Sequence, residues 1–314
     1  MEEALYSDLG FFNTDQVRSD KEGDFLTSPE VSKYFGKIIR NWIHSESNLK
    51  NIIEIGSGTG SLIEQIGIKE ITAVELSSTA REELIKKGID THTTIDELTT
   101  KTSDLIFGNE ILDNIPCSIG LYKDEGWYEK VVLLEENSLA YGLRPIRNEE
   151  LDWINKNNIV PNEDYEFEIQ VNIDKFLNSV IKKINPGKIL LFDYGYEQKN
   201  RDKRMYSSLL RTYKNHHLSV DPIDDPGNID ITYDVNFSSI SSELKYLGYD
   251  VTLKLQRDFL LDNGFNIFFD ELQEKYIAAE GIEKLKINSE LNGMKAIVDS
   301  NGLGGFYCLI AEKL

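Results

Sequence analysis

Apolar residues recur at helical spacing near the N-terminus. The run Thr27-Ser28-Pro29-Glu30 supplies a capping hydroxyl, a proline suited to a first turn and a glutamate three residues after the threonine. The apolar positions behind it fall at i, i+3, i+4, i+7, i+8 and i+11, which forms one face of a helix. The pattern predicts a helix over residues 29–43 that packs this face into a core. The face consists of Val31, Tyr34, Phe35, Ile38, Ile39 and Trp42.

Short apolar segments then alternate with helical ones. Helices are expected over residues 61–66 and 79–87, the second closed by Gly88. Such alternation is typical of an α/β fold, in which helices cover both faces of a mainly parallel sheet. The final strand is expected to insert antiparallel into this open sheet. The predicted strands cover residues 51–55, 71–76, 104–107, 188–192, 251–256 and 306–311.

Two long stretches interrupt the alternation. Residues 117–172 contain an expected hairpin with strands at 127–134 and 139–143. Residues 196–236 have little periodicity but many turn-forming and charged residues. Both stretches follow strands, at the carboxyl edge where open α/β sheets bind ligands. We therefore interpret both as insertions on the substrate side of the sheet.

Composition excludes several classes of partner. The chain has 34 Lys+Arg and 54 Asp+Glu residues, a formal net charge of −20, which disfavours nucleic-acid binding and favours cationic partners. Two distant cysteines and the adjacent His216 and His217 do not have metal-ligand spacing, so no metal site is expected. No apolar stretch is long enough for a membrane span, and the N-terminus lacks the basic flank of a signal peptide. We expect a cytoplasmic protein without membrane insertion.

A glycine-rich loop follows the first predicted strand and precedes a helix. Glycines there allow a sharp turn and a close approach of the backbone to a ligand. Glu75, at the end of the next strand, suits the two hydroxyls of an adenosine ribose. The loop is Gly56-Ser57-Gly58-Thr59-Gly60.

The spacing of the glycines discriminates between cofactors. The dinucleotide pattern G-x-G-x-x-G needs a glycine where this chain has Ser61. A compact loop preceded by an acid, Glu54, suits S-adenosylmethionine (SAM), which has no pyrophosphate and carries a cationic amino-acid end. We therefore expect SAM and methyl transfer, with a nicotinamide-linked dehydrogenase as a distant alternative.

Several blocks across nearly the whole chain have the order and spacing of a known family. The blocks are residues 22–31 with Phe35-Gly36, residues 54–62, residues 109–116, Asp193-Tyr194-Gly195, Arg211-Thr212-Tyr213 with His216, and residues 221–222 with 225–232. With these blocks the chain resembles the MidA family of class I SAM-dependent methyltransferases. This family has mitochondrial members that act in the assembly of respiratory complex I, and many bacterial and archaeal members.

The resemblance implies a Rossmann-like class I methyltransferase fold with a mostly parallel seven-stranded sheet and helices on both faces. Residues 1–48 would form an N-terminal helical cap, and residues 49–314 the core with its two insertions. Because the mitochondrial relatives dimethylate an arginine on a respiratory complex subunit, the implied function is protein arginine N-methylation. The implied partner is a protein with an exposed arginine, such as a respiratory complex subunit. The alternatives are a small-molecule methyltransferase and a SAM-binding assembly factor that acts mainly through partner binding.

Acids at predicted strand ends are the catalytic candidates. Glu110 is the leading ligand and base for a guanidinium, with Asp113 in support, because carboxylates can hold the guanidinium fork and accept a proton. The alternative for Glu110 is a cap of a following helix. Asp193 is a further catalytic candidate, and Asp230 and Thr232 are second candidates on the substrate side.

The remaining candidates surround the cofactor. Thr27 and Ser28 are expected to close over SAM from the N-terminal side, and Asn109 to contact its methionine part. Arg211 is expected to pair with Asp193 or Asp221 in a structural role. The full set of expected cofactor contacts is Glu54, Gly56, Ser57, Gly58, Gly60, Glu75, Asn109, Thr27 and Ser28.

Overall fold

A seven-stranded sheet organises the computed structural model, which describes residues 1–13, 27–46, 49–99, 103–136, 138–160, 163–203, 209–214, 217–218 and 221–313. Its strands are β1 (Ile52–Ile55), β2 (Ile71–Val74), β3 (Thr91–His92), β4 (Ser103–Asn109), β9 (Ile184–Asp193), β15 (Asp250–Leu255) and β16 (Tyr307–Lys313). The order is β15-β16-β9-β4-β1-β2-β3, and every neighbouring pair from β3 to β9 is parallel. β16 is antiparallel to both β9 and β15, as predicted for the final strand. The predicted α/β class I fold is confirmed.

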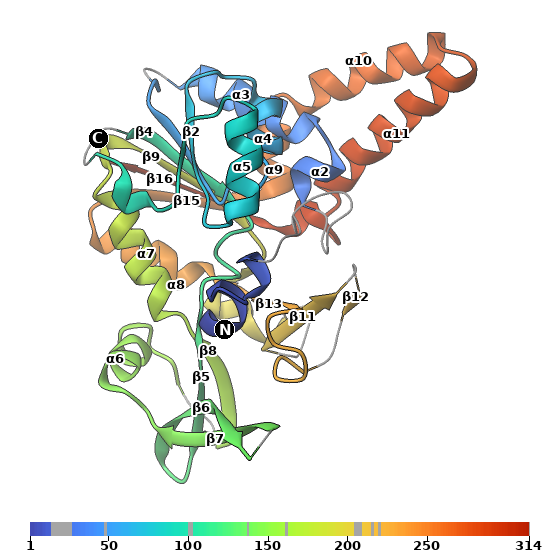
Figure 1. Ribbon diagram of the computed structural model, residues 1–314. Helices are drawn as coiled ribbons and strands as arrows, with labels where there is room; N and C mark the ends of the chain where they lie inside the picture. The colour runs from blue at the N-terminus through green and yellow to red at the C-terminus, as the bar shows by residue number, and fades with distance from the viewer. Residues whose placement is uncertain are drawn as a thin grey trace.

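Helices cover both faces of this sheet (Figure 1). Successive strand residues point to opposite faces, so Phe107 of β4 packs in one layer and Ile106 in the other. The first layer contains α3 (Tyr34–Ser45), α4 (Ser61–Ile66), α5 (Ser78–Lys86) and α9 (Gln256–Asp262). The second layer contains α7 (Val171–Ile181) and α8 (Phe237–Tyr246). Short 3-10 helices lie at η1 (Phe11–Asn13), η2 (Ile95–Glu97), η3 (Gln198–Lys203) and η4 (Leu303–Gly305).

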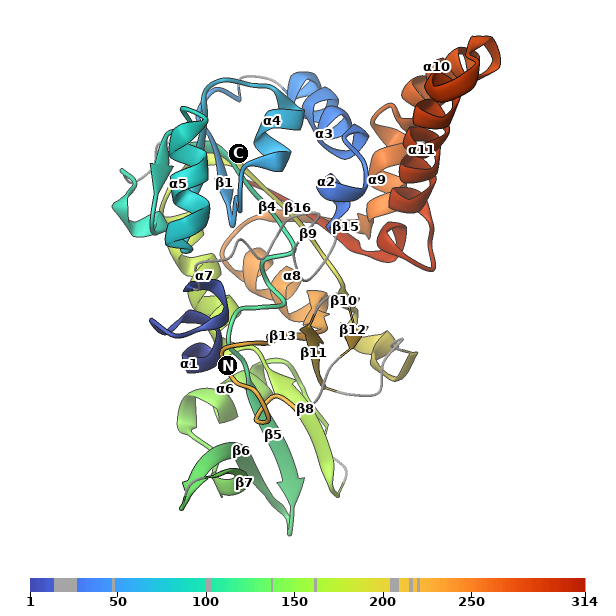
Figure 2. The same cartoon turned by 45° about the vertical axis from the view of Figure 1, so that its right-hand side comes forward.

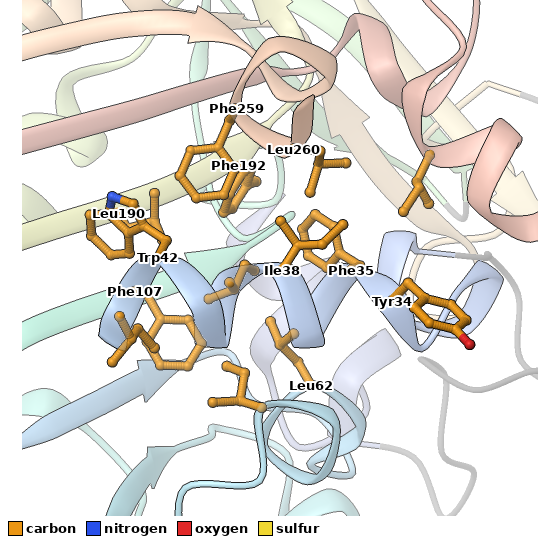
Figure 3. Packing of buried hydrophobic residues seen from close by; sticks show 14 of the residues in the cluster. Tyr34, Phe35, Ile38, Trp42, Leu62, Phe107, Leu190, Phe192, Phe259 and Leu260 are labelled. Atoms are coloured by element: carbon orange, nitrogen blue, oxygen red, sulfur yellow. The ribbon is translucent and has the colours of Figure 1, made fainter. Parts of the chain in front are cut away.

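Aromatic rings form the centre of the first layer. Figure 3 shows Phe35 of α3, Phe192 of β9 and Phe259 of α9 close together. The ring centroid of Phe192 lies 5.1 Å from that of Phe35 and 5.2 Å from that of Phe259, in edge-to-face contacts. Phe192 is 1% exposed, so it links the sheet to helices from both ends of the chain.

Replacing Phe192 with alanine is expected to lower the free energy of unfolding by about 3–5 kcal/mol, because the substitution leaves a cavity in a packed core. Chemical denaturation followed by circular dichroism measures this difference. Tyr246→Ala is the control: Tyr246 is 84% exposed, and its loss should cost no more than about 0.5 kcal/mol. Equal losses in the two variants would contradict the packing described for Phe192.

The helix predicted over residues 29–43 is interrupted. It consists of α2 (Ser28–Val31) and α3, because Ser32 adopts an extended conformation between them. Ser32 itself starts α3: its hydroxyl accepts a hydrogen bond from the Tyr34 N–H at 3.4 Å, and its carbonyl accepts one from the Phe35 N–H at 3.0 Å. The capping box between Thr27 and Glu30 is present as predicted. The extended backbone at Ser32 therefore divides the continuous apolar pattern between two helices.

The first insertion is a small antiparallel sheet with its own helix. It consists of β5 (Ser118–Lys123), β6 (Gly126–Glu135), β7 (Ser138–Pro145), α6 (Asn148–Lys156) and β8 (Tyr165–Ile169). The strand order is β7-β6-β5-β8, and the β6–β7 pair confirms the predicted hairpin. In Figure 1 this sheet extends away from the core.

The second insertion is also β-structure, although its sequence has little periodicity. The strands are β10 (Gly195–Tyr196), β11 (Leu210–Lys214), β12 (His217–Leu218), β13 (Asp230–Tyr233) and β14 (Val235–Asn236). β11 pairs with β12 and β13 in a three-stranded sheet, and β10 pairs with β14. α1 (Glu2–Tyr6) packs on β13 through Leu5 and Ile231. The N-terminal α1 therefore packs on the second insertion, whereas α3 belongs to the first helical layer. The N-terminal cap over residues 1–48 stays a prediction.

A helical hairpin of α10 (Phe265–Ala278) and α11 (Gly281–Val298) was not predicted. Figures 1 and 2 show it projecting from the core. Its base joins the first layer through Phe265, Leu272 and Met294, whereas Ile277 and Ile282 near its tip are exposed. Within the described part of the chain, no helix is long and apolar enough to cross a membrane.

Candidate functional site

A cavity opens at the carboxyl ends of β1, β2 and β4, where open α/β sheets bind ligands. Its lining comes from α1, η1, the start of α2, the loops after these three strands, and α7. The predicted site residues that line it are Thr27, Glu54, Gly56, Ser57, Gly58, Glu75, Asn109 and Glu110. The predicted site residues that do not are Ser28, Gly60, Asp113 and Asp193, all of which the structure describes.

The glycine loop adopts backbone angles that favour glycine. Gly56, Gly58 and Gly60 have φ angles of 68°, 52° and 84°. A Cβ at Gly56 would lie 2.4 Å from Cγ2 of Ile111, so only glycine allows the loop to approach the segment after β4 so closely. A Cβ at Gly60 would lie 2.7 Å from a methyl group of Leu84. Gly60 therefore allows the loop to pack closely against Leu84 of α5, and it does not line the cavity.

Glu75 connects the ends of β1 and β2. One of its carboxyl oxygens accepts a hydrogen bond from the Gly58 N–H at 2.8 Å, and the other accepts one from the Ser77 N–H at 2.8 Å. Burial raises the pKa of the Glu75 carboxyl, and these N–H groups oppose that shift. Each oxygen can accept a further hydrogen bond, so two vicinal hydroxyls beside the glycine loop would find two acceptors in one group.

Two buried acceptors at the end of β1 and β4 have no hydrogen-bond partner among the described residues. They are Oε2 of Glu54 and Oδ1 of Asn109, and both residues line the cavity. Glu54 is only 2% exposed, and burial raises the pKa of its carboxyl well above the usual range. A buried acceptor without a donor costs free energy, so this pair suits a ligand that brings several N–H donors.

Glu110 occupies a turn and not a helix start. Its φ angle of 52° is unusual for a residue with a side chain, and its N–H donates to the Phe192 carbonyl at 2.8 Å. No helix follows it in the described residues before β5, which rules out the predicted capping alternative. Its Oε1 accepts hydrogen bonds from the Ser28 N–H at 3.3 Å and from Nδ2 of Asn109 at 3.1 Å. Burial and the neighbouring Asp113 charge raise the pKa of Glu110 to about 8.

Asp113, predicted to support Glu110, and Asp193, a further catalytic candidate, are both buried and do not line the cavity. The fully buried Asp193 carboxylate accepts hydrogen bonds from the N–H groups of Leu112 at 2.8 Å, Asp113 at 3.3 Å and Tyr194 at 2.9 Å. Asp113 accepts a hydrogen bond from the Tyr194 hydroxyl. Burial raises the pKa of both carboxyls, that of Asp113 to about 6. These contacts make both acids supports of the turn that presents Glu110.

The second insertion holds the same turn from the other side. Nδ2 of Asn114 donates to Oδ1 of Asp230 at 2.9 Å and to the Ile231 carbonyl at 3.2 Å. The Tyr233 hydroxyl donates toward the carbonyls of Leu112, at 3.0 Å, and Ile115, at 2.7 Å. Asp230 therefore contacts the turn and not the cavity, and the buried Thr232 does not line the cavity either.

Arg211 and Ser28 also have structural contacts. Nη2 of Arg211 pairs with Oδ1 of Asp234 at 3.0 Å, a partner that was not predicted. The Ser28 hydroxyl hydrogen bonds to the side chain of Gln256, away from the cavity, while Thr27 lines it. Residues 22–26 and His216, which belong to the blocks that carry the family resemblance, lie outside the described residues.

The aromatic side chains that line one wall of the cavity were not predicted from the sequence. Tyr6 and Phe12 are stacked with their centroids 5.4 Å apart, and Phe176 of α7 also lines the cavity. The Tyr6 hydroxyl donates to the Asn114 carbonyl at 3.2 Å, which joins α1 to the turn after β4. The signal that could have found this wall is the run of aromatic residues Tyr6, Phe11 and Phe12 in a polar N-terminal segment.

The ligand-free protein is expected to lose stability as the pH rises from about 5 to about 8. The folded pKa of Glu110 is about 8 against an ordinary 4.5, so in this window the folded state binds more protons than the unfolded state. Burial shifts the pKa values of Glu54 and Asp193 in the same direction. Thermal unfolding across this window measures the effect, and Glu110→Gln should flatten the profile. Parallel profiles for the variant and the wild type would contradict the raised pKa of Glu110.

The comparisons with known proteins decide the family. A family model described as an S-adenosyl-L-methionine-dependent methyltransferase matches residues 36–252. The chain belongs to this methyltransferase family. The predicted resemblance to the MidA family is thereby confirmed, and the protein is a SAM-dependent methyltransferase.

Similar curated proteins carry arginine methyltransferase names. The chain is 25% identical to the mitochondrial protein arginine methyltransferase NDUFAF7 homolog of Caenorhabditis elegans, over 81% of this chain and 68% of that protein. It is 24% identical to the Drosophila melanogaster homolog, over 70% of this chain and 60% of that protein. For the Danio rerio NDUFAF7 the identity is 25%, over 85% of this chain and 72% of that protein.

Solved structures of a Burkholderia thailandensis protein have the same fold. One is a crystal structure of a methyltransferase-like protein bound to S-adenosylhomocysteine (SAH), with a TM-score of 0.85 and 22% identity, over 99% of this chain and 86% of that one. A native crystal structure from the same organism has a TM-score of 0.82 and 22% identity, over 99% of this chain and 85% of that one.

The residues of the cavity fit the cofactor of this methyltransferase family. The unpartnered oxygens of Glu54 and Asn109 match the ammonium group of the SAM amino-acid end, which offers three N–H donors. The Glu75 carboxyl matches the two ribose hydroxyls, and the apolar side chains of Leu76 and Phe176 offer a surface for the adenine ring. The observation that carries this fit is the orphaned, buried Glu54 oxygen, which a cationic donor would satisfy.

Proposed function

We propose that this methyltransferase transfers methyl groups to arginine side chains of a protein. The names of the similar curated proteins support an arginine acceptor, although this chain spans only 60–72% of the three compared. The observation that carries the proposal is the Glu110 carboxyl at the cavity. Among the described residues it has neutral hydrogen-bond partners and pairs with no lysine or arginine, so a cation from outside can bind it.

The chemistry follows from this placement. SAM supplies an electrophilic methyl group when it is bound. A guanidinium can be held by the Glu110 carboxylate through charge-assisted hydrogen bonds, while Glu30 on the same cavity wall adds negative charge. The guanidinium nitrogen that gains the methyl group must lose a proton, and Glu110 can accept it, because a base with a pKa near the working pH is effective.

The turn around Glu110 holds the carboxyl in place for this step. The Asp193 carboxylate binds the N–H groups of Leu112 and Asp113, and the Ser28 N–H fixes Oε1 of Glu110. Alignment of nucleophile and methyl group supplies much of the rate of a displacement, so this support is part of the catalytic arrangement. Subunits of respiratory complexes, which the family resemblance suggests, are the first acceptors to test.

The proposal is tested by incubating the purified protein with tritium-methyl SAM and a lysate from cells that lack its gene. Label should appear in the protein fraction and be reduced by about a hundredfold or more when Glu110→Gln replaces the wild type. Label confined to the small-molecule fraction would contradict the proposal and favour a metabolite acceptor. SAH binding without transfer to either fraction would contradict it in favour of a SAM-binding assembly factor.

A further inference from the structure

One face of the β6–β7 ribbon is apolar and uncovered. Cross-strand partners in an antiparallel pair lie on the same side of a sheet. The register pairs Val132 with Tyr141, Leu134 with Leu139, and Lys130 with Leu143. The exposed fractions of the apolar members are 52% for Val132, 76% for Leu134, 37% for Leu139, 41% for Tyr141 and 48% for Leu143. We call these five residues the ribbon face.

The opposite side of the same sheet packs at its base, although Leu133, which points to that side near the tip, is 44% exposed. Trp127 and Phe167 point to that side and form a core with Trp153 and Ile154 of α6. None of the five residues of the ribbon face belongs to this core. A contiguous apolar surface of this kind on a highly charged protein indicates a binding surface.

Acids surround the ribbon face. Glu135 and Glu136, both exposed, form the turn at its tip. In the middle of the face the Tyr141 hydroxyl donates a hydrogen bond to Asp221, and burial together with the charges of Asp221 and Asp224 raises the pKa of Tyr141. Lys130 is paired with Glu166 at 3.2 Å, so it does not offset these charges.

This distribution of charge favours a basic binding partner over a second copy of the chain. In a symmetric contact between two copies, each ribbon face would bring its acids against an identical acidic rim, on chains with a net charge of −20 each. A segment with apolar side chains flanked by lysine or arginine would instead match both the apolar face and its rim.

The ribbon is also connected to the turn that carries Glu110. β5 begins at Ser118, directly after the turn, and Nδ2 of Asn172 donates to the Pro116 carbonyl at 2.8 Å. The loop that contains Asp221 leads into β13, whose Asp230 holds Asn114. A protein that presents a side chain to the cavity can therefore contact elements anchored at the same turn.

We propose that the ribbon face docks an extended basic and apolar segment of the methyl-acceptor protein, at a distance from the arginine that is modified. This inference rests on the proposed function, because it takes the acceptor to be a protein. β7 is an edge strand of its sheet, so an extended segment can add to it through main-chain hydrogen bonds while its alternate side chains lie over the ribbon face.

The test uses a fluorescein-labelled synthetic peptide in which three leucines alternate with threonines between pairs of lysines. Fluorescence anisotropy should show binding to the wild-type protein that weakens by about tenfold or more in the double variant Val132→Ser, Leu134→Ser. The control Ile277→Ser, which removes a side chain that is 78% exposed on α10, should bind as the wild type does. Asp224→Lys should also weaken binding, and a peptide with glutamate ends should bind less well.

Three results would overturn the inference. They are equal affinity of the wild type and the double variant, equal affinity for the basic and acidic peptides, and a wild-type dimer in sedimentation that the double variant dissociates. Circular dichroism and SAH titration verify that each variant is folded. Because the peptide contains no arginine and the assay needs no SAM, failure here is distinguishable from failure of the proposed arginine methylation.

Discussion

Replacing Glu110 with glutamine is expected to lower the rate of methyl transfer to protein by about a hundredfold or more. Glutamine keeps an oxygen that can accept from the Ser28 N–H and from Nδ2 of Asn109, so the turn should keep its shape. It has no negative charge for a guanidinium and cannot accept the proton that the nucleophile loses. Single-turnover transfer from labelled SAM measures the rate.

The same variant should bind SAH with nearly the wild-type affinity, because Glu54 and Glu75 are unchanged. Calorimetric titration with SAH separates loss of chemistry from loss of cofactor binding. Glu274→Gln is the matched control, since it makes the same change at an exposed position of α10 and should leave the rate unchanged. Full activity of Glu110→Gln would show that the base and the guanidinium ligand lie elsewhere.

Replacing Glu54 with glutamine is expected to weaken SAH binding by about 10- to 100-fold, because a charge-assisted hydrogen bond to the ammonium is lost. The stability of the ligand-free protein should move in the opposite direction. Glu54 is buried with an unpartnered oxygen and a raised pKa, so removal of its ionisable group should leave the unfolding temperature unchanged or higher. Calorimetry and thermal unfolding measure the two effects.

Weaker SAH binding together with an unchanged or higher unfolding temperature distinguishes a ligand-binding carboxyl from a structural one. A structural carboxyl would lose stability and affinity together when it is replaced. Glu70→Gln, at an exposed turn before β2, provides the control for the change of charge and should alter neither quantity. An unchanged SAH affinity in Glu54→Gln would contradict the assignment of the ammonium site.

Local patterns along the chain predicted six of the seven strands of the main sheet, and the two-residue edge strand β3 was missed. β4 and β9 are buried on both faces, so their apolar runs were clear, and Gly56 to Gly60 followed a strand as a ligand-binding loop does. The α10–α11 hairpin was missed because apolar residues such as Ile277 and Ile282 lie on its exposed surface and blur the helical stripe. The second insertion was missed as β-structure because its short strands depend on tertiary partners.

The acidic residues of the site were predicted in position but not in orientation. Because Glu110, Asp113 and Asp193 follow predicted strands, they were correctly placed at one edge of the sheet, but the sequence did not predict where their side chains point. The positive φ angle of Glu110 directs its side chain to the cavity, while Asp193 is used to bind backbone N–H groups of the turn. Such a backbone conformation depends on contacts from β9 and β13, which are distant in sequence.

Amino-acid analysis of the labelled acceptor shows whether the methyl group is transferred to arginine. Protein labelled by the wild-type enzyme with tritium-methyl SAM is hydrolysed completely, and the labelled amino acids are separated against methylated standards. The label is expected to elute with methylarginines and to fall by about a hundredfold with Glu110→Gln. Label in methyl-lysine or methyl-histidine, or label released from a methyl ester as volatile methanol, would contradict methylation of arginine.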